Sequence, residues 1–458
     1  MEQSEIFDVI VIGAGYAGLT AARKLIDTGK KVLLLEARDR IGGRVYTEKL
    51  DEDTYVDLGG QWLGPTQDRI YALAKEFGVE TFKTFNTGKS RMLVGGKLKE
   101  YSGIIPKLSL PALLSLDRAL KKITKMANKV SLNKPWGSPD AKKLDSMTLA
   151  SWMDKHILFA ETRRFFTIGV EAVFAAHPSE ISLLHALFYI KSGKGMENLI
   201  SVENGAQEER VVGGAQEPAN RLAKTFWNHI RLNSPVKEIT QKAEEVIVNG
   251  KDFSFKAKRV IVAIPPYLSG QISYEPLLPS ARAQLTQRMP MGSVIKCYAI
   301  YDKPFWRDEG LNGQAVSDNG FATVVFDNSL KDAKKGILMG FALANQAKAL
   351  TEKPLEERKS IVLKEFGQYF GQKALHPLQY LDKSWAEEEW SRGCYAGIMP
   401  TGVWTSLGHA LRTPFGKIHW AGTETAEEWN GYIEGAIRSG ERAATEVLEG
   451  LMKFEAVV

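Results

Sequence analysis

The stretch that decides the fold is FDVIVIGAGYAG, residues 7–18, close to the start of the chain. Residues 7–12 form a nearly continuous apolar and β-branched run, which is typical of a strand covered on both faces. Residues 19–29 have helical spacing and end at Gly29, and residues 31–35 (KVLLL) indicate a second buried strand. This order predicts a right-handed βαβ unit in a parallel sheet.

The glycines between the first strand and the helix follow the G-x-G-x-x-G pattern of dinucleotide-binding proteins. Gly13 allows a tight turn, Gly15 lets backbone approach a pyrophosphate, and Gly18 lets the helix pack closely on the strand. A helix that begins near Tyr16 points free amides at the phosphates. Glu36 ends the second strand, where its carboxylate accepts ribose hydroxyls and repels a 2′-phosphate, which argues against NADP.

Residues 37–47 (ARDRIGGRVYT) extend the predicted phosphate site. They place Arg38, Arg40 and Arg44 around Gly42 and Gly43. Glycines leave backbone amides accessible, and arginine side chains make two-point contacts with phosphate. We therefore expect this segment to contact the same ligand as Gly15.

Two more segments favour a tightly held flavin over an exchangeable nicotinamide. DLGGQW at 57–62 is a second turn with bare backbone, and AGTETAEEWNGYIEGA at 421–436 predicts a second helix start near Tyr432. The amides of that helix start suit the electron-rich carbonyl edge of a flavin ring. FAD is the cofactor that these features predict.

Further strand patterns lie far along the chain, at 258–264 and 417–421, and alternating runs at 234–255 predict an antiparallel meander. We expect an α/β fold: a Rossmann-like FAD-binding domain of the GR2 type, discontinuous in sequence, with an inserted α+β substrate domain. The predicted FAD-binding domain comprises 1–80, 205–289 and 386–458, and the predicted substrate domain comprises 81–204 and 290–385.

Composition excludes several classes of protein. The 458 residues are 44% hydrophobic and 25% charged, as in folded proteins, and a net charge of +6 gives no nucleic-acid signature. The two cysteines fit a reducing compartment, and the seven histidines show no H-E-x-x-H spacing, so no metal site is predicted. No apolar run approaches the ~20 residues that span a bilayer, and no signal peptide precedes residue 7, so we expect a cytoplasmic protein without a transmembrane anchor.

The stretch 107–143 is unusually basic, with nine Lys and Arg against two acidic residues, and its apolar residues recur at helical intervals. A helix lying on a membrane surface has this composition. The pattern favours instead the solvated basic face of a helix within a domain.

Taken together, the motifs resemble those of flavin monoamine oxidases, in the same order and over essentially the whole chain. The matching segments are GAGYAG, Glu36, RIGGR, DLGGQW-x-GPTQ, NGAQEERVVGG (204–214), AIPP (263–266), MGSVIKC (291–297), SRGCY (391–395) and AGTETAEEWNGYIEGA. The resemblance implies cofactor contacts from Gly13, Gly15, Gly18, Glu36, Arg38, Gly43, Arg44, Gly59, Gly60, Gln61, Trp62, Val236, Trp385, Cys394, Gly422, Thr423, Glu424 and Ile433.

The resemblance also implies a reaction. Such enzymes oxidise an amine to an imine, which hydrolyses to an aldehyde or ketone and ammonia, while dioxygen becomes hydrogen peroxide. Tyr395 and Tyr432 match the aromatic cage beside the flavin. A cation–π contact gives only ~0.5–2 kcal/mol, which is less than the cost of desolvating an ammonium. The cage therefore suits the neutral amine. Lys296 matches the lysine that holds a water against flavin N5 and aids the reaction with oxygen. Cys394 matches the residue that bonds covalently to the flavin 8α-methyl, although Arg392 replaces a glycine of the covalent members.

Substrate contacts follow from the same resemblance. Gln207 matches a substrate-facing glutamine and Ile200 a gating side chain, and Glu171 lies in a segment expected to line the cavity. A carboxylate there suits the far ammonium of a diamine, although a solvated helix face is the favoured interpretation. The sequence leaves four alternative functions open: a polyamine or diamine (putrescine-type) oxidase, an L-amino-acid oxidase, a flavin-binding protein without turnover, and a nicotinamide dehydrogenase. It also does not specify which amine is oxidised. The expected partners are a small amine and O2, with a homodimer possible; the lack of a C-terminal membrane helix suggests a soluble, bacterial-type member.

Overall fold

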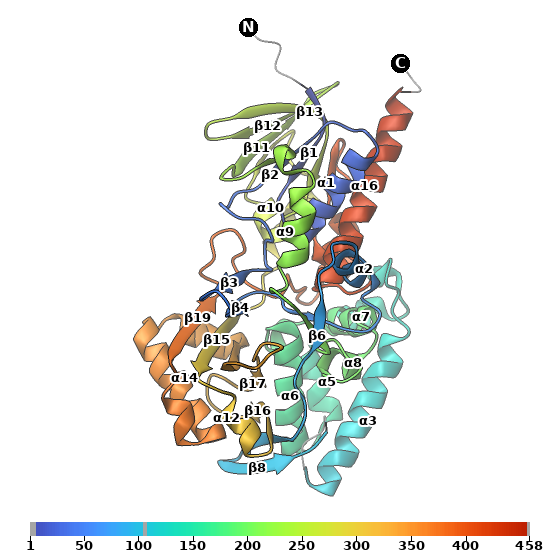
Figure 1. The fold of residues 1–458 in the computed structure, drawn as a ribbon. Coiled ribbons are helices and arrows are strands. Elements are labelled where there is room, and N and C mark those ends of the chain that lie inside the picture. The colour runs from blue at the N-terminus through green and yellow to red at the C-terminus, as the bar shows by residue number, and fades with distance from the viewer. Residues whose placement is uncertain (1–5, 104–107, 456–458) are drawn as a thin grey trace.

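The computed structural model describes residues 6–103 and 108–455. Two large sheets lie one above the other, and the first strand begins and the last helix ends at the same end of the molecule (Figure 1). Besides the helices described below, the chain forms α2 (Asp68–Glu76), α4 (Ala141–Asp145), α5 (Leu149–His156), α8 (Met196–Ile200), α9 (Glu217–Lys224), α10 (Pro266–Ser269), α11 (Ser280–Gln287), α12 (Phe305–Asp308), α13 (Ala344–Thr351), α14 (Leu355–Phe370) and α15 (Val403–Leu407).

The first sheet contains the predicted βαβ unit. Its order is β10-β2-β1-β13-β12-β11-β14, with β20 also on β13: β10 (Ile230–Arg231), β2 (Val32–Leu35), β1 (Ile6–Ile12), β13 (Ser254–Val262), β12 (Val246–Gly250), β11 (Val236–Gln241), β14 (Ser273–Glu275) and β20 (Ile418–Trp420). Strand β1 pairs in parallel with both β2 and β13, and β11, β12 and β13 form an antiparallel meander. The predicted βαβ unit and the predicted antiparallel meander are both confirmed.

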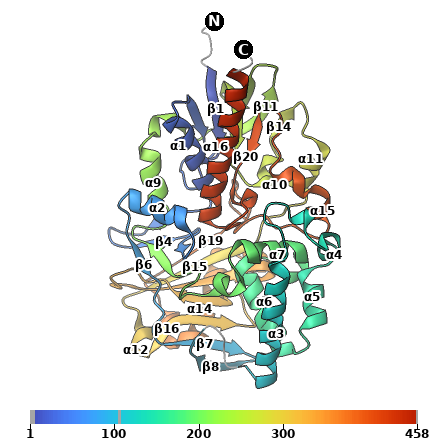
Figure 2. The ribbon, with the colours of Figure 1, turned by 90° about the vertical axis from the view of Figure 1, so that its right-hand side faces the viewer.

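Strand β1 is apolar and buried from Val9 to Ile12 because both faces of the sheet are covered there. Val9 and Val11 pack into a cluster with α1 (Tyr16–Asp27) and α16 (Ile433–Glu455), whereas Ile10 and Ile12 pack into a second cluster with the meander. Figure 2 shows that α1 and α16 lie side by side, next to β1. A continuous buried run is what a two-sided parallel strand needs.

The second sheet has the order β19-β15-β18-β17-β16-β7-β8 and is antiparallel except between β16 and β7. Its strands are β19 (Gln379–Ser384), β15 (Val294–Tyr301), β18 (Gly336–Leu343), β17 (Val324–Asp327), β16 (Leu311–Ser317), β7 (Lys89–Val94) and β8 (Lys97–Tyr101). Helices α3 (Leu110–Ala127), α6 (Ala160–Phe174) and α7 (Leu183–Ser192) gather beside it (Figure 2). The predicted fold class, a Rossmann-like domain with an α+β substrate domain, is confirmed.

Small sheets connect the two halves. Strand β9 (Glu209–Val211) pairs with β5 (Trp62–Leu63) and with β6 (Thr81–Lys83), and β3 (Thr47–Lys49) pairs with β4 (Tyr55–Asp57). Strand β6 falls inside the segment predicted as substrate domain, but its partner β9 comes from a segment predicted as FAD-binding domain. The chain therefore crosses between the halves near this three-stranded sheet.

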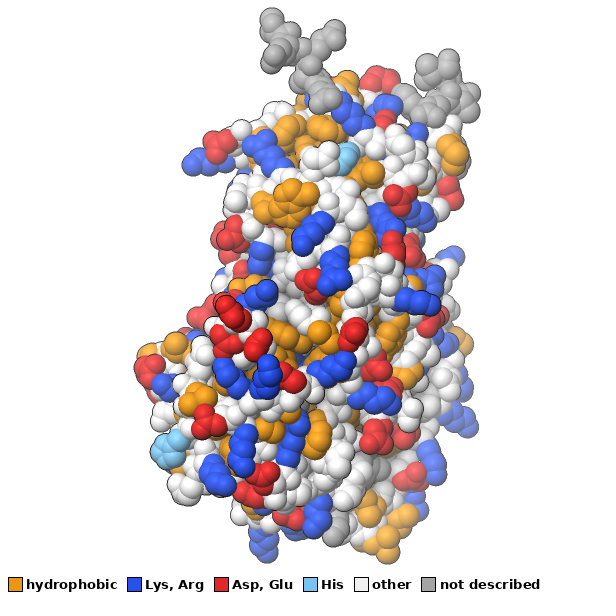
Figure 3. Space-filling view, viewed as in Figure 1, with side chains coloured by type: hydrophobic (Ala, Val, Ile, Leu, Met, Phe, Trp, Pro, Cys, Tyr) orange, Lys and Arg blue, Asp and Glu red, His pale blue; other side chains and the backbone are white. Residues whose placement is uncertain are grey.

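Residues 110–127 of the basic stretch form α3, which buries Leu116 and Ile123 against α6 and α7 and exposes Lys121, Lys122 and Lys125. Lys107 lies outside the described residues. On the face in Figure 3, basic and acidic side chains are interspersed rather than segregated. Within residues 6–103 and 108–455, no helix is both long and apolar enough to cross a membrane.

Candidate active site

One cavity of about 1140 Å³ joins the two sheets. It extends from the carboxyl ends of β1 and β2, past the start of α16, to a chamber between α6 and the second sheet. Pockets for drug-sized ligands measure roughly 300–1,000 Å³. The cavity therefore has room for a dinucleotide and a small substrate together.

Gly13 and Gly15 of the glycine motif line the cavity beside the first helix, whereas Gly18, which was also expected to contact the cofactor, does not. Gly13 has a φ of +101°, and a Cβ on Gly18 would lie 1.8 Å from the Gly13 carbonyl oxygen, so packing excludes a side chain at both positions. A Cβ on Gly15 would approach no protein atom closer than 3.9 Å. Because Gly15 is the N-cap residue of α1 and lines the cavity, this open space fits a phosphate group held by the helix N-terminus.

Glu36 lines the cavity at the end of β2, as predicted. Its buried carboxylate accepts hydrogen bonds from the amides of Ala14 (2.7 Å) and Arg38 (2.9 Å). The guanidinium of Arg38 also lines the cavity and donates to Glu388 (3.3 Å) and Ser391 (2.8 Å). The carboxylate is thus fixed in direction before any ligand binds.

Arg44 lines the cavity, but its guanidinium does not present a free fork to phosphate. It donates to both oxygens of Glu424, at 2.6 and 3.0 Å, and to the Tyr395 carbonyl oxygen at 2.9 Å. Glu424 itself does not line the cavity, and Arg40 lies over the Tyr46 ring, 4.1 Å from its centroid, outside the cavity lining. The sequence missed the Arg44 pair because Glu424 lies near the other end of the chain.

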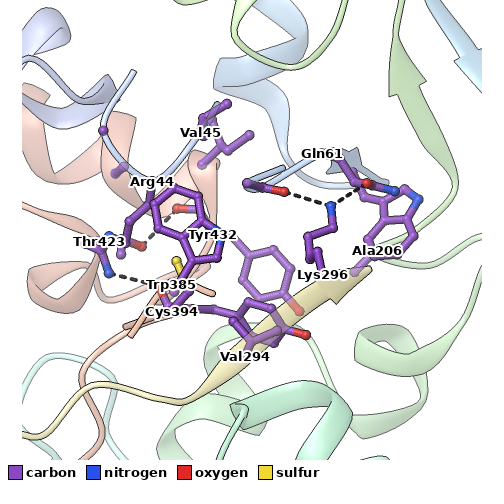
Figure 4. A pocket seen from close by; sticks show the side chains of 18 of the residues that line it. Arg44, Val45, Gln61, Ala206, Val294, Lys296, Trp385, Cys394, Thr423 and Tyr432 are labelled. Carbon is purple, nitrogen blue, oxygen red and sulfur yellow. Dashed lines mark hydrogen bonds between the residues drawn. The ribbon is translucent and has the colours of Figure 1, made fainter. Parts of the chain in front are cut away.

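Lys296 extends from β15 to the turn at 57–62. Its ammonium donates to the carbonyl oxygens of Asp57 (2.5 Å) and Gly59 (3.0 Å) and to Gln61 Oε1 (2.6 Å). Figure 4 shows this side chain reaching Gln61, across the cavity from Trp385, Cys394 and Tyr432. Burial lowers the pKa of Lys296 to about 7. The predicted buried lysine is therefore present, and its charge changes near neutral pH.

Tyr395 and Tyr432 both line the cavity, on segments far apart in sequence. The Tyr395 ring lies edge-on to Phe341 with 6.3 Å between centroids, and the Tyr432 ring packs against Trp429 at 4.9 Å and Tyr189 at 6.3 Å. Burial raises the pKa of both phenols, so both rings remain uncharged. The chamber thus presents two neutral aromatic rings.

Trp385 and Cys394 lie together at the cavity wall (Figure 4). The indole of Trp385 donates to the Leu58 carbonyl oxygen at 2.8 Å, and Cys394 is buried, which raises the pKa of its thiol to about 12. Arg392 has a φ of +56°, a left-handed conformation that glycine adopts more easily. The remaining cofactor positions on the lining are Gly43, Gly59, Gly60, Trp62, Val236, Gly422, Thr423 and Ile433.

The substrate positions are only partly as expected. Gln207 and Ile200 line the cavity, and Gln207 donates to the Leu199 carbonyl oxygen at 3.0 Å. Glu171 does not line it, although Ala172, next on α6, does. Glu171 is 6% exposed, and burial raises its pKa to about 7. Both expectations for Glu171 fail: it is neither on the cavity wall nor on a solvated face.

Most of the residues that form the chamber wall could not be predicted from the sequence. These lining residues share no local motif and come from five elements and a loop; they include Phe165, Ile168, Tyr189, Phe326, Phe341, Asn86, Asn312 and Gln314. Asn86 Oδ1 accepts hydrogen bonds from the side-chain amides of Asn312 and Gln314, and Asn312 Oδ1 accepts one from the Gln314 backbone amide. The alternation of apolar residues along the strands was the only sequence signal that pointed to these lining residues.

Comparison with known proteins agrees with this geometry. Residues 16–448 match the family described as flavin containing amine oxidoreductase. Similar proteins include the probable flavin-containing monoamine oxidase A of Dictyostelium discoideum, 40% identical over 98% of this chain and 99% of that protein, and the flavin-containing amine oxidase B of Sus scrofa, 39% identical over 98% and 87%.

Similar solved structures include a wild-type putrescine oxidase bound to putrescine, with a TM-score of 0.93 and 32% identity over 97% of this chain and 99% of that one. Another is the cyclohexylamine oxidase of Brevibacterium oxydans IH-35A, with a TM-score of 0.94 and 33% identity over 98% and 100%. The chain belongs to the flavin-containing amine oxidoreductase family.

Proposed function

We propose that this protein is an FAD-dependent oxidase of small primary or secondary amines. It converts the amine to an imine, which hydrolyses to an aldehyde or ketone and ammonia or a smaller amine, and reduces O2 to H2O2. The observation that carries the proposal is the single cavity that connects the dinucleotide cradle at Gly15 to the chamber of Tyr395 and Tyr432.

The residues around the cradle fit a flavin dinucleotide. Gly15 leaves space at a helix N-terminus, Glu36 presents a carboxylate for ribose hydroxyls, and Thr423 and Ile433 lie near the start of α16. When bound, the flavin accepts a hydride equivalent from the carbon beside the amine nitrogen and passes the electrons to dioxygen. We propose the segments 1–80, 205–289 and 386–458 as the domain that holds it.

The chamber selects the form of the amine. Its walls are mainly apolar, and Tyr395 and Tyr432 carry no charge. Desolvating an ammonium costs several kcal/mol, whereas a cation–π contact returns only ~0.5–2 kcal/mol. The chamber therefore favours the neutral amine, whose lone pair assists removal of hydrogen from the adjacent carbon, and the two rings orient it.

Lys296 supplies a positive charge on the wall between the chamber and the 57–62 turn. The three oxygens that its ammonium contacts hold it in one position. Electron transfer to dioxygen develops negative charge, which a fixed cation stabilises in a dry site. Lys296 is therefore the residue that we assign to the oxygen half of the reaction.

Monoamines fit the chamber better than two alternatives. A diamine oxidase needs a carboxylate for the far ammonium. Glu171 does not reach the cavity, and the two carboxylate residues that line it beyond the cofactor cradle, Glu197 and Glu203, are exposed. An L-amino-acid oxidase needs an arginine for the substrate carboxylate, and the arginines on the described lining, Arg38 and Arg44, are both paired with acidic residues. The structural relatives act on putrescine and cyclohexylamine by name, so both amine types belong in a test panel.

We also propose that Cys394 binds the flavin covalently. The thiol lines the cavity beside Trp385. Forming the carbon–sulfur bond removes one hydrogen from the thiol and one from the flavin methyl group. Dioxygen takes up these two electrons and two protons as hydrogen peroxide.

A panel of amines tests the function. Purified protein should show a visible flavin band and release hydrogen peroxide with benzylamine, cyclohexylamine or a secondary amine faster than with putrescine or an L-amino acid. A colourless protein that takes up no flavin, or a yellow one that releases no peroxide with any of these compounds, contradicts the proposal.

A further inference from the structure

The mainly apolar wall of the chamber carries a network of hydrogen-bonded polar side chains. Its members are Asn86, Ser90, Glu203, Asn312 and Gln314, and we call them the distal network. All except Ser90 line the cavity. Ser90 and Asn312 are buried, whereas Glu203 is exposed, so the distal network runs from solvent into the interior of the protein.

The two ends of the distal network fix the orientation of its amides. A carboxylate only accepts hydrogen bonds, so Asn86 directs its Nδ2 at Glu203 Oε1, at 2.9 Å, and its Oδ1 the other way. That Oδ1 accepts from Gln314 Nε2 at 2.6 Å and from Asn312 Nδ2 at 3.5 Å. The backbone amide of Gln314 only donates, and it bonds to Asn312 Oδ1 at 2.9 Å, so Asn312 donates from Nδ2 to Ser90 Oγ, also at 2.9 Å. Exchanging the oxygen and nitrogen of any one of these amides would bring two donors or two acceptors together.

This orientation leaves the side-chain oxygen of Gln314 available. Its Nε2 is used by Asn86, so Oε1 cannot be exchanged with it, and Oε1 has no hydrogen-bond partner among the residues that the structure describes. Gln314 is half-buried and lines the cavity. The chamber wall therefore presents a neutral acceptor to a bound molecule.

Strand pairing in the second sheet gives the distance from this acceptor to the aromatic chamber. Phe341 on β18 pairs with Val324 on β17, and Val324 pairs with Val316 on β16. These three side chains line the cavity, and the Tyr395 ring packs edge-on to Phe341. Gln314 lies two residues before Val316, on the same face of β16. Neighbouring strands are about 4.8 Å apart, so Gln314 lies on the order of 10 Å from Phe341.

We propose that Gln314 binds a hydroxyl group at the far end of the substrate, a role that rests on the proposed function. The amine nitrogen lies between Tyr395 and Tyr432, and the hydroxyl donates to Gln314 Oε1. A neutral amide does not compensate for desolvating a second ammonium, so the donor that fits is a hydroxyl. The substrate class is an amino alcohol whose two groups are about 10 Å apart, the distance that the strand spacing sets.

Octylamine and straight-chain ω-aminoheptanol test this preference, because they differ only in a terminal methyl or hydroxyl group. The quantity measured is the ratio of kcat/KM for the amino alcohol to kcat/KM for octylamine, with flavin-loaded protein. The ratio should exceed one in the natural protein and fall about tenfold in Gln314→Met, which keeps the length of the side chain and removes the acceptor. The same fall is expected in Gln314→Leu, so the test does not depend on one variant folding.

Two exposed carboxylates on the cavity wall separate orientation from charge. Glu203→Leu removes the acceptor that directs Asn86, so Gln314 is no longer held in one orientation and the ratio should fall in part. Glu197→Leu is the matched control, because Glu197 also lines the cavity but makes no hydrogen bond to the distal network among the described residues, and the ratio should not change. A ratio that stays constant in Gln314→Met, or that falls equally in Glu197→Leu, overturns the proposal. A higher kcat/KM for the diamine of the same chain length than for the amino alcohol also overturns it.

Binding of analogues that cannot be oxidised separates the hydroxyl site from the reaction. Two methyl groups on the carbon beside the nitrogen of octylamine and of ω-aminoheptanol remove the hydrogens that oxidation needs, and calorimetry with flavin-loaded protein gives a Kd for each analogue. The hydroxyl should lower the Kd in the natural protein but not in Gln314→Met. If no amine reduces the flavin but this difference is found, the proposed function fails and the hydroxyl site stands. If amines are oxidised normally and the difference is absent, only the hydroxyl site fails.

Discussion

Arg44 and Glu424 are 380 residues apart in the chain, yet they form a two-point ion pair with N···O distances of 2.6 and 3.0 Å. Glu424 also accepts the Gly397 amide at 3.1 Å, and Arg44 donates to the Tyr395 carbonyl oxygen. The pair therefore fixes the backbone that carries Cys394 and Tyr395 against the cofactor half of the molecule.

Removing one partner of this pair should destabilise the fold strongly. Glu424→Gln leaves the Arg44 guanidinium buried without its counter-charge, and breaking a buried pair costs about 3–5 kcal/mol. Denaturant unfolding measures the loss. Asp117→Asn is the control, because the Asp117–Lys121 pair is exposed and contributes under about 1 kcal/mol. Equal, small losses in both variants would show that the buried pair does not anchor the structure.

Replacing the two chamber tyrosines should separate flavin binding from amine oxidation. Tyr395→Leu combined with Tyr432→Leu keeps apolar bulk but removes the rings that orient the amine, and misplacement of a substrate by an ångström costs roughly 10²-fold in rate. We expect a normal flavin band and flavin reduction by amine slowed by at least that factor in anaerobic stopped flow. Near-normal reduction would remove both residues from the site.

Lys296→Met should slow reoxidation more than reduction. The natural protein should also lose reoxidation rate as the pH rises through about 7, since burial places the pKa of Lys296 there and the neutral amine no longer stabilises negative charge on oxygen. The variant should show no such pH dependence. Stopped-flow traces in which reduction is the slowed step would assign Lys296 a different role.

Cys394 should hold flavin through acid precipitation. Yellow colour should remain with the precipitated natural protein and pass into the supernatant for Cys394→Ser. Cys297→Ser is the matched control, because Cys297 is equally buried but lies off the cavity and should keep the colour in the pellet. Colour that leaves the natural protein completely would rule out the covalent bond.

Sequence patterns predicted the features that depend on residues close together in the chain. The apolar run in β1, the glycines after it and Glu36 at the end of β2 are close in sequence, so their spacing alone specifies a strand, a turn, a helix and a carboxylate at the sheet edge. Each of the three glycines has the environment that its position in the motif requires.

Long-range partners were not predictable in the same way. Arg44 was expected to face phosphate. Its pairing with Glu424 could not be predicted, because it depends on how the two ends of the chain meet in the fold. Glu171 does lie on a helix beside the cavity, as expected. Successive helical residues point about 100° apart, so its neighbour Ala172 reaches the cavity wall and Glu171 does not.

Anaerobic mixing of the purified flavin-loaded protein with a small amine such as benzylamine or cyclohexylamine tests amine oxidation most directly. We predict that the visible flavin band bleaches in a single turnover, that admitting air restores it, and that one equivalent of hydrogen peroxide appears for each amine oxidised. A flavin band that stays unchanged with every primary and secondary amine tried would contradict the assignment of this chamber to amine oxidation.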